Sequence, residues 1–176
     1  AVLPFASIHP DREHDYFADG ITEELISAIS RIQGLDVIAR TSVVRYKGSD
    51  ARIAEIAREL NVGVVLEGSV RKAGDQLRVT VQLINAESEG HLWAEDYDRE
   101  FREIFAVQRD IASQVAAALR LRLRAPEAER IGKAPTEDLA AYDLYLLGRH
   151  SLNLRSDPGI RQAIASFQRA VERDGD

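Results

Sequence analysis

The 176-residue sequence contains no cysteine, and this absence removes two kinds of site at once. Disulfide bonds and thiolate metal ligands both require cysteine, so neither can stabilise this chain. The sequence also lacks any run of about 18 apolar residues, the length that a membrane-spanning helix needs. It carries no signal-peptide pattern either. We therefore expect no membrane insertion by this chain, and its compartment stays open.

Positive charge is not in surplus. The chain carries 23 lysines and arginines against 29 aspartates and glutamates, which gives a net charge of -6. Domains that bind nucleic acid through its phosphates usually present a basic stripe. The basic residues that do gather, Arg120, Arg122 and Arg124, alternate with leucines. We therefore expect no direct contact with nucleic acid.

The composition that remains is typical of a folded domain with a small appendage. Hydrophobic residues make up 45% of the chain and charged residues 30%. The first sixty residues alternate short apolar runs with helical patterns. We expect strands at Val2–Phe5 and Val37–Ala39, and helices at Asp19–Gly34 and Asp50–Asn61. In both helices the first residue is an aspartate that can cap free amides.

Between residues 62 and 97 the pattern changes to a period of two. Three runs, Val62–Lys72, Leu77–Ala86 and His91–Tyr97, are separated by turn residues and predict an antiparallel meander. Trp93 and Tyr97 fall on one face of the third run. We expect that face to lie in the core, the alternative being an aromatic surface that binds a peptide.

Three further helices complete the prediction. One spans Arg102–Leu123, residues 124–135 form a linker with proline at both ends, and two helices follow at Glu137–Leu152 and Pro158–Arg173. The predicted fold is α/β (α+β), a mixed sheet with the order β-α-β-α-β-β-β-α, followed by a helical hairpin. The predicted domains are residues 1–123 and 136–176.

Five blocks of the sequence together resemble a known family. They are Val2–Phe5, Tyr16–Leu25, Val37–Ser42, Leu66–Arg71 and Leu92–Glu95. In this order they are similar to the TolB amino-terminal-like domain of bacterial multidomain regulators. The resemblance implies a non-catalytic regulatory module beside tetratricopeptide (TPR) repeats, downstream of a cyclase or winged-helix domain. It implies no catalytic residue and no cofactor.

The last forty residues resemble one TPR unit. The spacing of six residues carries this likeness: Leu144, Leu147, Gly148, Ala163, Phe167 and Ala170. The loop before the second helix is about three residues longer than a 34-residue unit allows. Because a TPR unit is stabilised by stacking on neighbours, we expect its helices to bind a protein partner. A homodimer through residues 142–171 is one such arrangement.

Two groups of polar residues are candidate sites. Arg40, Thr41 and Ser42 follow the predicted second strand, near Asp19, where α/β sheets often bind ligands. They could hold an anion or a small ligand, or Arg40 could pair with a nearby acid and fix the loop. In the loop from His9 to Asp19, a metal site could use His9, Asp11, His14 and Asp15. Their spacing fits no known metal motif, so the alternative, a solvated charged loop, is expected.

These observations lead to one main functional prediction with two alternatives. The chain is expected to be a regulatory protein-interaction module and not an enzyme, since no base lies near a nucleophile in any recognisable motif. The first alternative is a sensor of a small ligand or an anion. The second alternative is a hydrolase that uses the acidic loop.

Overall fold

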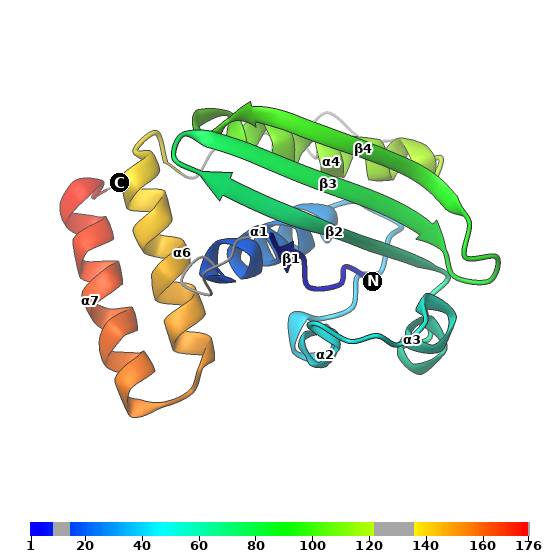
Figure 1. Cartoon of the computed structure of the whole chain (residues 1–176), viewed down its shortest axis with the longest axis horizontal. Coiled ribbons are helices and arrows are strands. Elements are labelled where there is room, and N and C mark those ends of the chain that lie inside the picture. The colour runs from blue at the N-terminus through cyan, green and yellow to red at the C-terminus, as the bar shows by residue number, and fades with distance from the viewer. Residues whose placement is uncertain (9–14, 122–135, 176) are drawn as a thin grey trace.

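The computed structural model describes residues 1–8, 15–121 and 136–175 (Figure 1). The predicted linker at residues 124–135 and most of the acidic loop at residues 9–15 lie outside these ranges. Within them, no helix is both long and apolar enough to cross a membrane.

Four strands form one mixed sheet in the order β1-β2-β3-β4. β1 (Ala6–Ser7) runs parallel to β2 (Val64–Ala73), and β3 (Gln76–Asn85) and β4 (His91–Glu100) continue the sheet in antiparallel pairs. The predicted meander is therefore confirmed. Its first turn contains Gly74 at φ 58°, a left-handed conformation that suits glycine.

The predicted first strand is interrupted, although the residues on both sides of the interruption pair with β2. Val2 bridges to Leu66 of β2, but Pro4 has no N–H to donate. The N–H of Phe5 then donates to Thr22 Oγ1 at 2.9 Å. Because this bond leads away from the sheet, the predicted strand at residues 2–5 becomes a bridge that precedes β1.

The predicted second strand at Val37–Ala39 is wrong. Residues 35–39 form a loop that pairs with no strand, and a short helix, α2 (Arg40–Val43), follows directly. Val37 packs against one hydrophobic cluster and Ile38 against another. The apolar run thus reflects burial between two clusters and not sheet pairing, so the observed order has one strand fewer than predicted.

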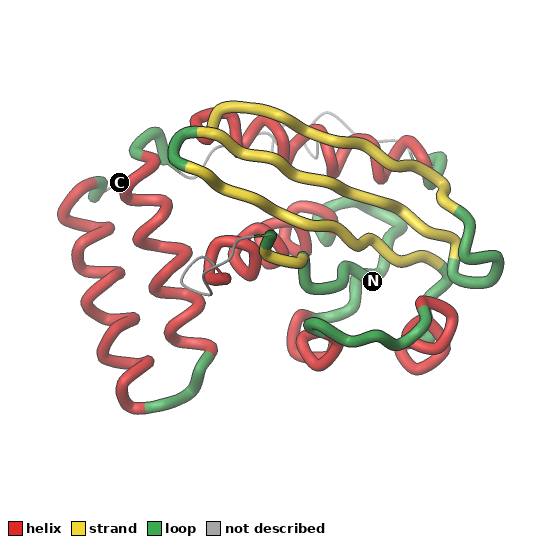
Figure 2. The backbone as a smooth tube through the Cα atoms, in the orientation of Figure 1, coloured by secondary structure: helices red, strands yellow, loops and turns green. Residues whose placement is uncertain are grey.

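Helices cover one face of the sheet, and two short helices lie beside β2 (Figures 1 and 2). α1 (Asp15–Ile29) and α4 (Ile104–Ala118) pack against the face formed by Leu77, Val79, Val81 and Leu83. Val65 points to the opposite face of β2 and joins the smaller cluster under α2 and α3 (Ile53–Leu60). Two 3-10 turns, η2 (Val44–Tyr46) and η3 (Phe101–Glu103), connect these helices to their neighbours.

The helix boundaries differ from the prediction most clearly in α1, α3 and α4. α1 already includes Asp15, so Asp19 lies inside the helix and does not cap it. α3 ends at Asn61 as expected, and Asn61 has φ 53°. Its first turn is not capped by Asp50 as predicted. Instead, the carboxylate of Glu89 accepts from the N–H of Ala54. α4 is shorter than predicted because the chain leaves the helix just before residue 120, which has φ 56°.

The predicted helical hairpin is present. α6 (Leu139–Asn153) begins at Asp138, whose carboxylate accepts from two backbone amides, and α7 (Asp157–Arg173) begins at Ser156. Figure 1 shows the hairpin at one end of the sheet with α6 beside α1. Tyr142 and Leu146 of α6 belong to the same hydrophobic core as α1 and α4. The hairpin is therefore packed on the α/β domain.

Candidate functional site

The contact between α1 and α6 depends on a glycine. A Cβ atom at Gly20 would lie 2.7 Å from Cδ2 of Leu146, closer than carbon atoms approach each other. Leu146 is fully buried. The absence of a side chain at residue 20 therefore lets α6 lie directly against α1.

Glu23 is the centre of the polar part of this contact. Its side chain is only 5% exposed, so its charge must be balanced by partners. Arg40 Nε lies 2.6 Å from one carboxylate oxygen, and Asn153 Nδ2 donates to the same oxygen at 2.8 Å. Arg149 Nη2 pairs with the other oxygen. Residues from α1, α2 and α6 thus meet at one buried carboxylate.

Asp19 joins the same interface one helical turn earlier. Its carboxylate lies 2.6 Å from Lys47 Nζ and 2.9 Å from His150 Nδ1. Burial alone would raise the pKa of Asp19, but the hydrogen bonds from His150 and Lys47 outweigh this effect, and the pKa is lowered. Asp19 is therefore a structural anion that holds a loop and the hairpin to α1.

The structure does not assemble the four predicted crevice residues into one site. Arg40 and Asp19 both lie in the polar interface, and Arg40 pairs with Glu23. This is the alternative in which the arginine fixes its loop. Thr41 and Ser42 are exposed in the short helix α2 and have no part in the contacts of Arg40 with Glu23. Binding of an anion or a small ligand by these four residues stays a prediction.

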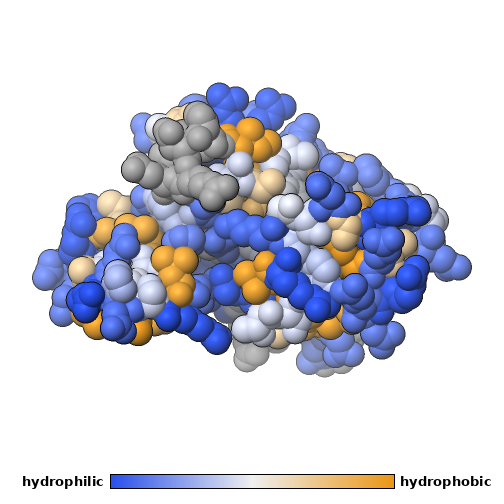
Figure 3. All heavy atoms as spheres, turned by 60° about the horizontal axis from the view of Figure 1, so that its bottom comes forward, coloured by the Kyte–Doolittle hydropathy of each residue, from blue (hydrophilic) through white to orange (hydrophobic). Residues whose placement is uncertain are grey.

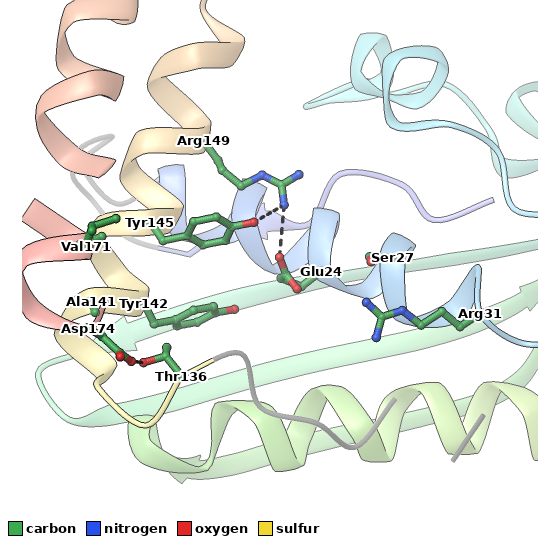
Figure 4. A pocket seen from close by; sticks show the side chains of 11 residues that line it. Glu24, Ser27, Arg31, Thr136, Ala141, Tyr142, Tyr145, Arg149, Val171 and Asp174 are labelled. Carbon is green, nitrogen blue, oxygen red and sulfur yellow. Dashed lines mark hydrogen bonds and ion pairs between the residues drawn. The ribbon is translucent and has the colours of Figure 1, made fainter. Parts of the chain in front are cut away.

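A cavity of about 450 Å³ lies next to this interface, between α1, α6 and α7 (Figure 4). Arg149 links its walls, since Nη1 donates to the Tyr145 hydroxyl at 2.9 Å and lies 3.3 Å from Glu24 Oε1. Burial raises the pKa of Glu24, and Arg149 counteracts this. The remaining lining residues are Ser27, Arg31, Thr136, Ala141, Tyr142, Ala170, Val171 and Asp174.

Of the residues that line this cavity, sequence reasoning predicted only Ala170 as a site residue, as part of the TPR unit, and missed the others. The signal that could have found them is the helical spacing of Tyr142, Tyr145 and Arg149, which places all three on neighbouring positions of α6. The Tyr142 hydroxyl accepts from Gln108 Nε2 at 3.0 Å, and burial raises its pKa. A buried tyrosine with one polar partner is the kind of group that anchors an interface.

Some of the predicted TPR residues lie in the contact between the two helices of the hairpin. A Cβ atom at Gly148 would lie 2.6 Å from the ring of Phe167, so this glycine allows close packing. Ala163 is buried, and Ala170 is partly buried. Leu144 and Leu147 are only partly buried, and the fully buried leucine of α6 is Leu146. The assignment of the hairpin as a TPR unit stays a prediction.

Among the described residues, no three histidines, aspartates or glutamates come together in a group that could hold a metal ion. The predicted metal alternative concerned the loop with His9, Asp11 and His14. These three residues lie outside the described ranges, and Asp15 is the first described residue of α1.

Comparisons with known proteins place this geometry in a wider context. Over 174 residues, 99% of its length, the chain is 47% identical to a Rhizobium meliloti (strain 1021) protein described as "Putative adenylate cyclase 3". It spans only 30% of that relative.

Two solved structures show a distant likeness. A PelC dodecamer from Paraburkholderia phytofirmans (18% identity, TM-score 0.42) matches 69% of this chain and 86% of its own. The LpoB C-terminal domain from Salmonella enterica (14% identity, TM-score 0.40) matches 56% of this chain and 78% of its own.

A family described as the second domain of HilA/YgeH-like transcriptional regulators matches residues 1–114. The chain belongs to this family of regulator domains.

Proposed function

We propose that this chain is a non-catalytic regulatory module of a longer bacterial protein. In this proposal the α/β domain holds the helical hairpin in a fixed position, and the hairpin binds a protein partner. A signal that moves the α/β domain then moves the partner as well. The resemblance to a TPR unit supports the same role for the hairpin.

The observation that carries the proposal is the buried carboxylate of Glu23. A buried charge is stabilising only while its partners stay in place. Here the partners come from α2 and from α6, so the hairpin cannot leave α1 without exposing or orphaning this charge. The interface therefore favours one fixed orientation of the hairpin.

Membership of a regulator family and the likeness to a protein named as a cyclase both support a regulatory role. We place any cyclase chemistry outside this chain, because the chain matches less than a third of that relative. Incubation of the 176-residue chain with ATP and Mg²⁺ is expected to yield no cyclic AMP. Formation of cyclic AMP by the chain would overturn the non-catalytic assignment.

Glu23→Gln tests the coupling between domain and hairpin. The variant keeps the size of the side chain but leaves Arg40 and Arg149 without their buried anion. We expect backbone hydrogen exchange in α6 and α7 to increase by about tenfold or more, while exchange in β2 and β3 stays as in the wild type. The control is Glu59→Gln, since Glu59 pairs with Arg45 but is 59% exposed. Unchanged exchange in the Glu23 variant would refute the coupling.

A small-ligand sensor is the second candidate function, and the cavity between α1, α6 and α7 favours it. Cavities that bind small molecules have volumes of about 300–1,000 Å³ and combine aromatic walls with a few polar groups. Inorganic phosphate is a suitable first probe for an anion. Saturable chemical-shift changes at the amides of Tyr145 and Arg149 would support a sensor, and unperturbed spectra at high phosphate would rule out this anion.

A further inference from the structure

One face of α7 carries an apolar stripe of which the hairpin partly buries Phe167, whose ring packs against Gly148, and leaves the other members exposed. Ile160, Ile164, Phe167 and Val171 fall within an arc of about 60° at 3.6 residues per turn. The exposed fractions of Ile160, Ile164 and Val171 are 42%, 52% and 65%. Figure 3 shows apolar side chains at the surface on the side where the hairpin lies, among charged ones.

The face of α7 that approaches α6 most closely is adjacent to this stripe. It consists of small residues at the same helical spacing: Gly159, Ala163, Ser166 and Ala170. A Cβ atom at Gly159 would lie 2.6 Å from the backbone oxygen of Ser151, which confirms how closely this face approaches α6. The apolar stripe lies about a quarter turn away, so packing within the hairpin leaves most of it exposed.

The spacing of the stripe is symmetric. Its steps are four, three and four residues, so the stripe reads the same in both directions along the helix. If two copies of α7 lie antiparallel about a two-fold axis, Ile160 faces Val171 of the second copy and Ile164 faces Phe167. A self-complementary patch of this kind is what a two-fold homodimer requires.

The charges beside the stripe are complementary in the same arrangement. Arg161 and Glu172 are both exposed, lie on the same flank of the stripe and form no ion pair within the described part of the chain. In this dimer, Arg161 of one copy and Glu172 of the second copy are offset by only about 3 Å along the helix axis. Each dimer would therefore gain two intermolecular ion pairs.

We propose that the apolar stripe of α7 binds the α7 stripe of a second copy of this chain, in an antiparallel and two-fold symmetric dimer. This inference deepens the proposed function, because it names the partner of the hairpin. Antiparallel helices also place the positive end of each helix dipole beside the negative end of the other.

Sedimentation velocity of the 176-residue chain over a range of concentrations tests the proposal. We expect a reversible dimer, and Ile164→Glu should weaken it at least about tenfold because the new charge is buried in the interface. The control is Val44→Glu, since Val44 is 40% exposed on the α/β domain, and this variant should dimerise as the wild type does.

A charge exchange tests the geometry. Arg161→Glu and Glu172→Arg should each weaken the dimer, and the double variant should restore it. Each single change is compatible with its helix end, since an acid near the start and a base near the end of a helix are favourable. Circular dichroism should therefore show an intact fold in all three variants.

Three outcomes would overturn the proposal: a monomer at every concentration, a dimer that Ile164→Glu leaves intact, or a double variant that fails to recover. A monomer whose hairpin still shows the exchange response to Glu23→Gln would overturn the dimer alone and leave the proposed function standing.

Discussion

Gly20 offers a direct test of how closely the hairpin is packed on the α/β domain. Alanine at this position would place its Cβ atom 2.7 Å from Cδ2 of Leu146. Leu146 is 0% exposed and belongs to the hydrophobic core, so we expect its side chain to shift only at a cost in packing. The substitution Gly20→Ala therefore sets a steric cost against a gain in helix propensity.

The two effects can be compared. Alanine stabilises the interior of a helix by about 1 kcal/mol relative to glycine. Overpacking a well-packed contact costs about 1–3 kcal/mol. We therefore expect Gly20→Ala to lower the free energy of unfolding by up to about 2 kcal/mol. Leu146→Ala alone should cost about 2–5 kcal/mol because it leaves a cavity.

The double variant makes the test sharp because the sign of the effect reverses. When Leu146 is already alanine, the clash at residue 20 is removed and only the helix propensity remains. In that background Gly20→Ala should stabilise the chain by up to about 1 kcal/mol. The expected result is thus a destabilising change in one background and a stabilising change in the other.

Urea unfolding of the four chains, followed by circular dichroism, gives the free energies. Hydrogen exchange in α6 then shows whether the loss is located in the hairpin. If Gly20→Ala stabilises the chain equally in both backgrounds, α1 and α6 do not touch at this point. The account of the hairpin as a fixed part of the domain would then be wrong.

Two further changes concern polar side chains at the start of α6. The N–H of Ala141 and the guanidinium of Arg173 lower the pKa of Asp138 from its ordinary value of 3.8. The ionised Asp138 carboxylate therefore stabilises the fold above pH 3.8, and this stabilisation is lost as the pH falls through the lowered pKa. Asp138→Asn, which can still cap α6, should flatten this acid-side loss of thermal stability between about pH 5 and about pH 3. Tyr142→Phe leaves Gln108 without its acceptor and should lower the free energy of unfolding by about 1–3 kcal/mol in urea, and an unchanged value would contradict the buried bond.

Local chemistry explains which elements could be predicted. The meander follows from the alternation of apolar and polar residues in β3 and from the glycine at residue 74, both of which act over a few residues. The end of α3 at Asn61 follows from the tolerance of asparagine for a left-handed conformation. The hairpin follows from helical spacing and from proline at the start of α7.

The residues that were not predicted depend on contacts between distant parts of the chain. The sequence around Val37–Ala39 has the composition of a strand, but a strand also needs a partner, and the sheet gives it none. In the same way, the sequence around Arg40 left two roles open for its side chain, the binding of an anionic ligand or an ion pair with a nearby acidic residue. Only the position of α6, about 110 residues later in the sequence, brings Arg149, the second cation that shares the carboxylate of Glu23 with Arg40.

The extent of the structural unit follows from α1. This helix is buried on most of its surface, because the sheet covers one side, α2 and its loop a second, and α6 a third. The match to the regulator family ends at residue 114, before the hairpin begins. A unit that stopped there would expose the surface of α1 on which Leu146 packs and would leave Glu23 with Arg40 alone. The buried charge and the glycine contact therefore join the hairpin to the same folded unit as the sheet, as the proposed function requires.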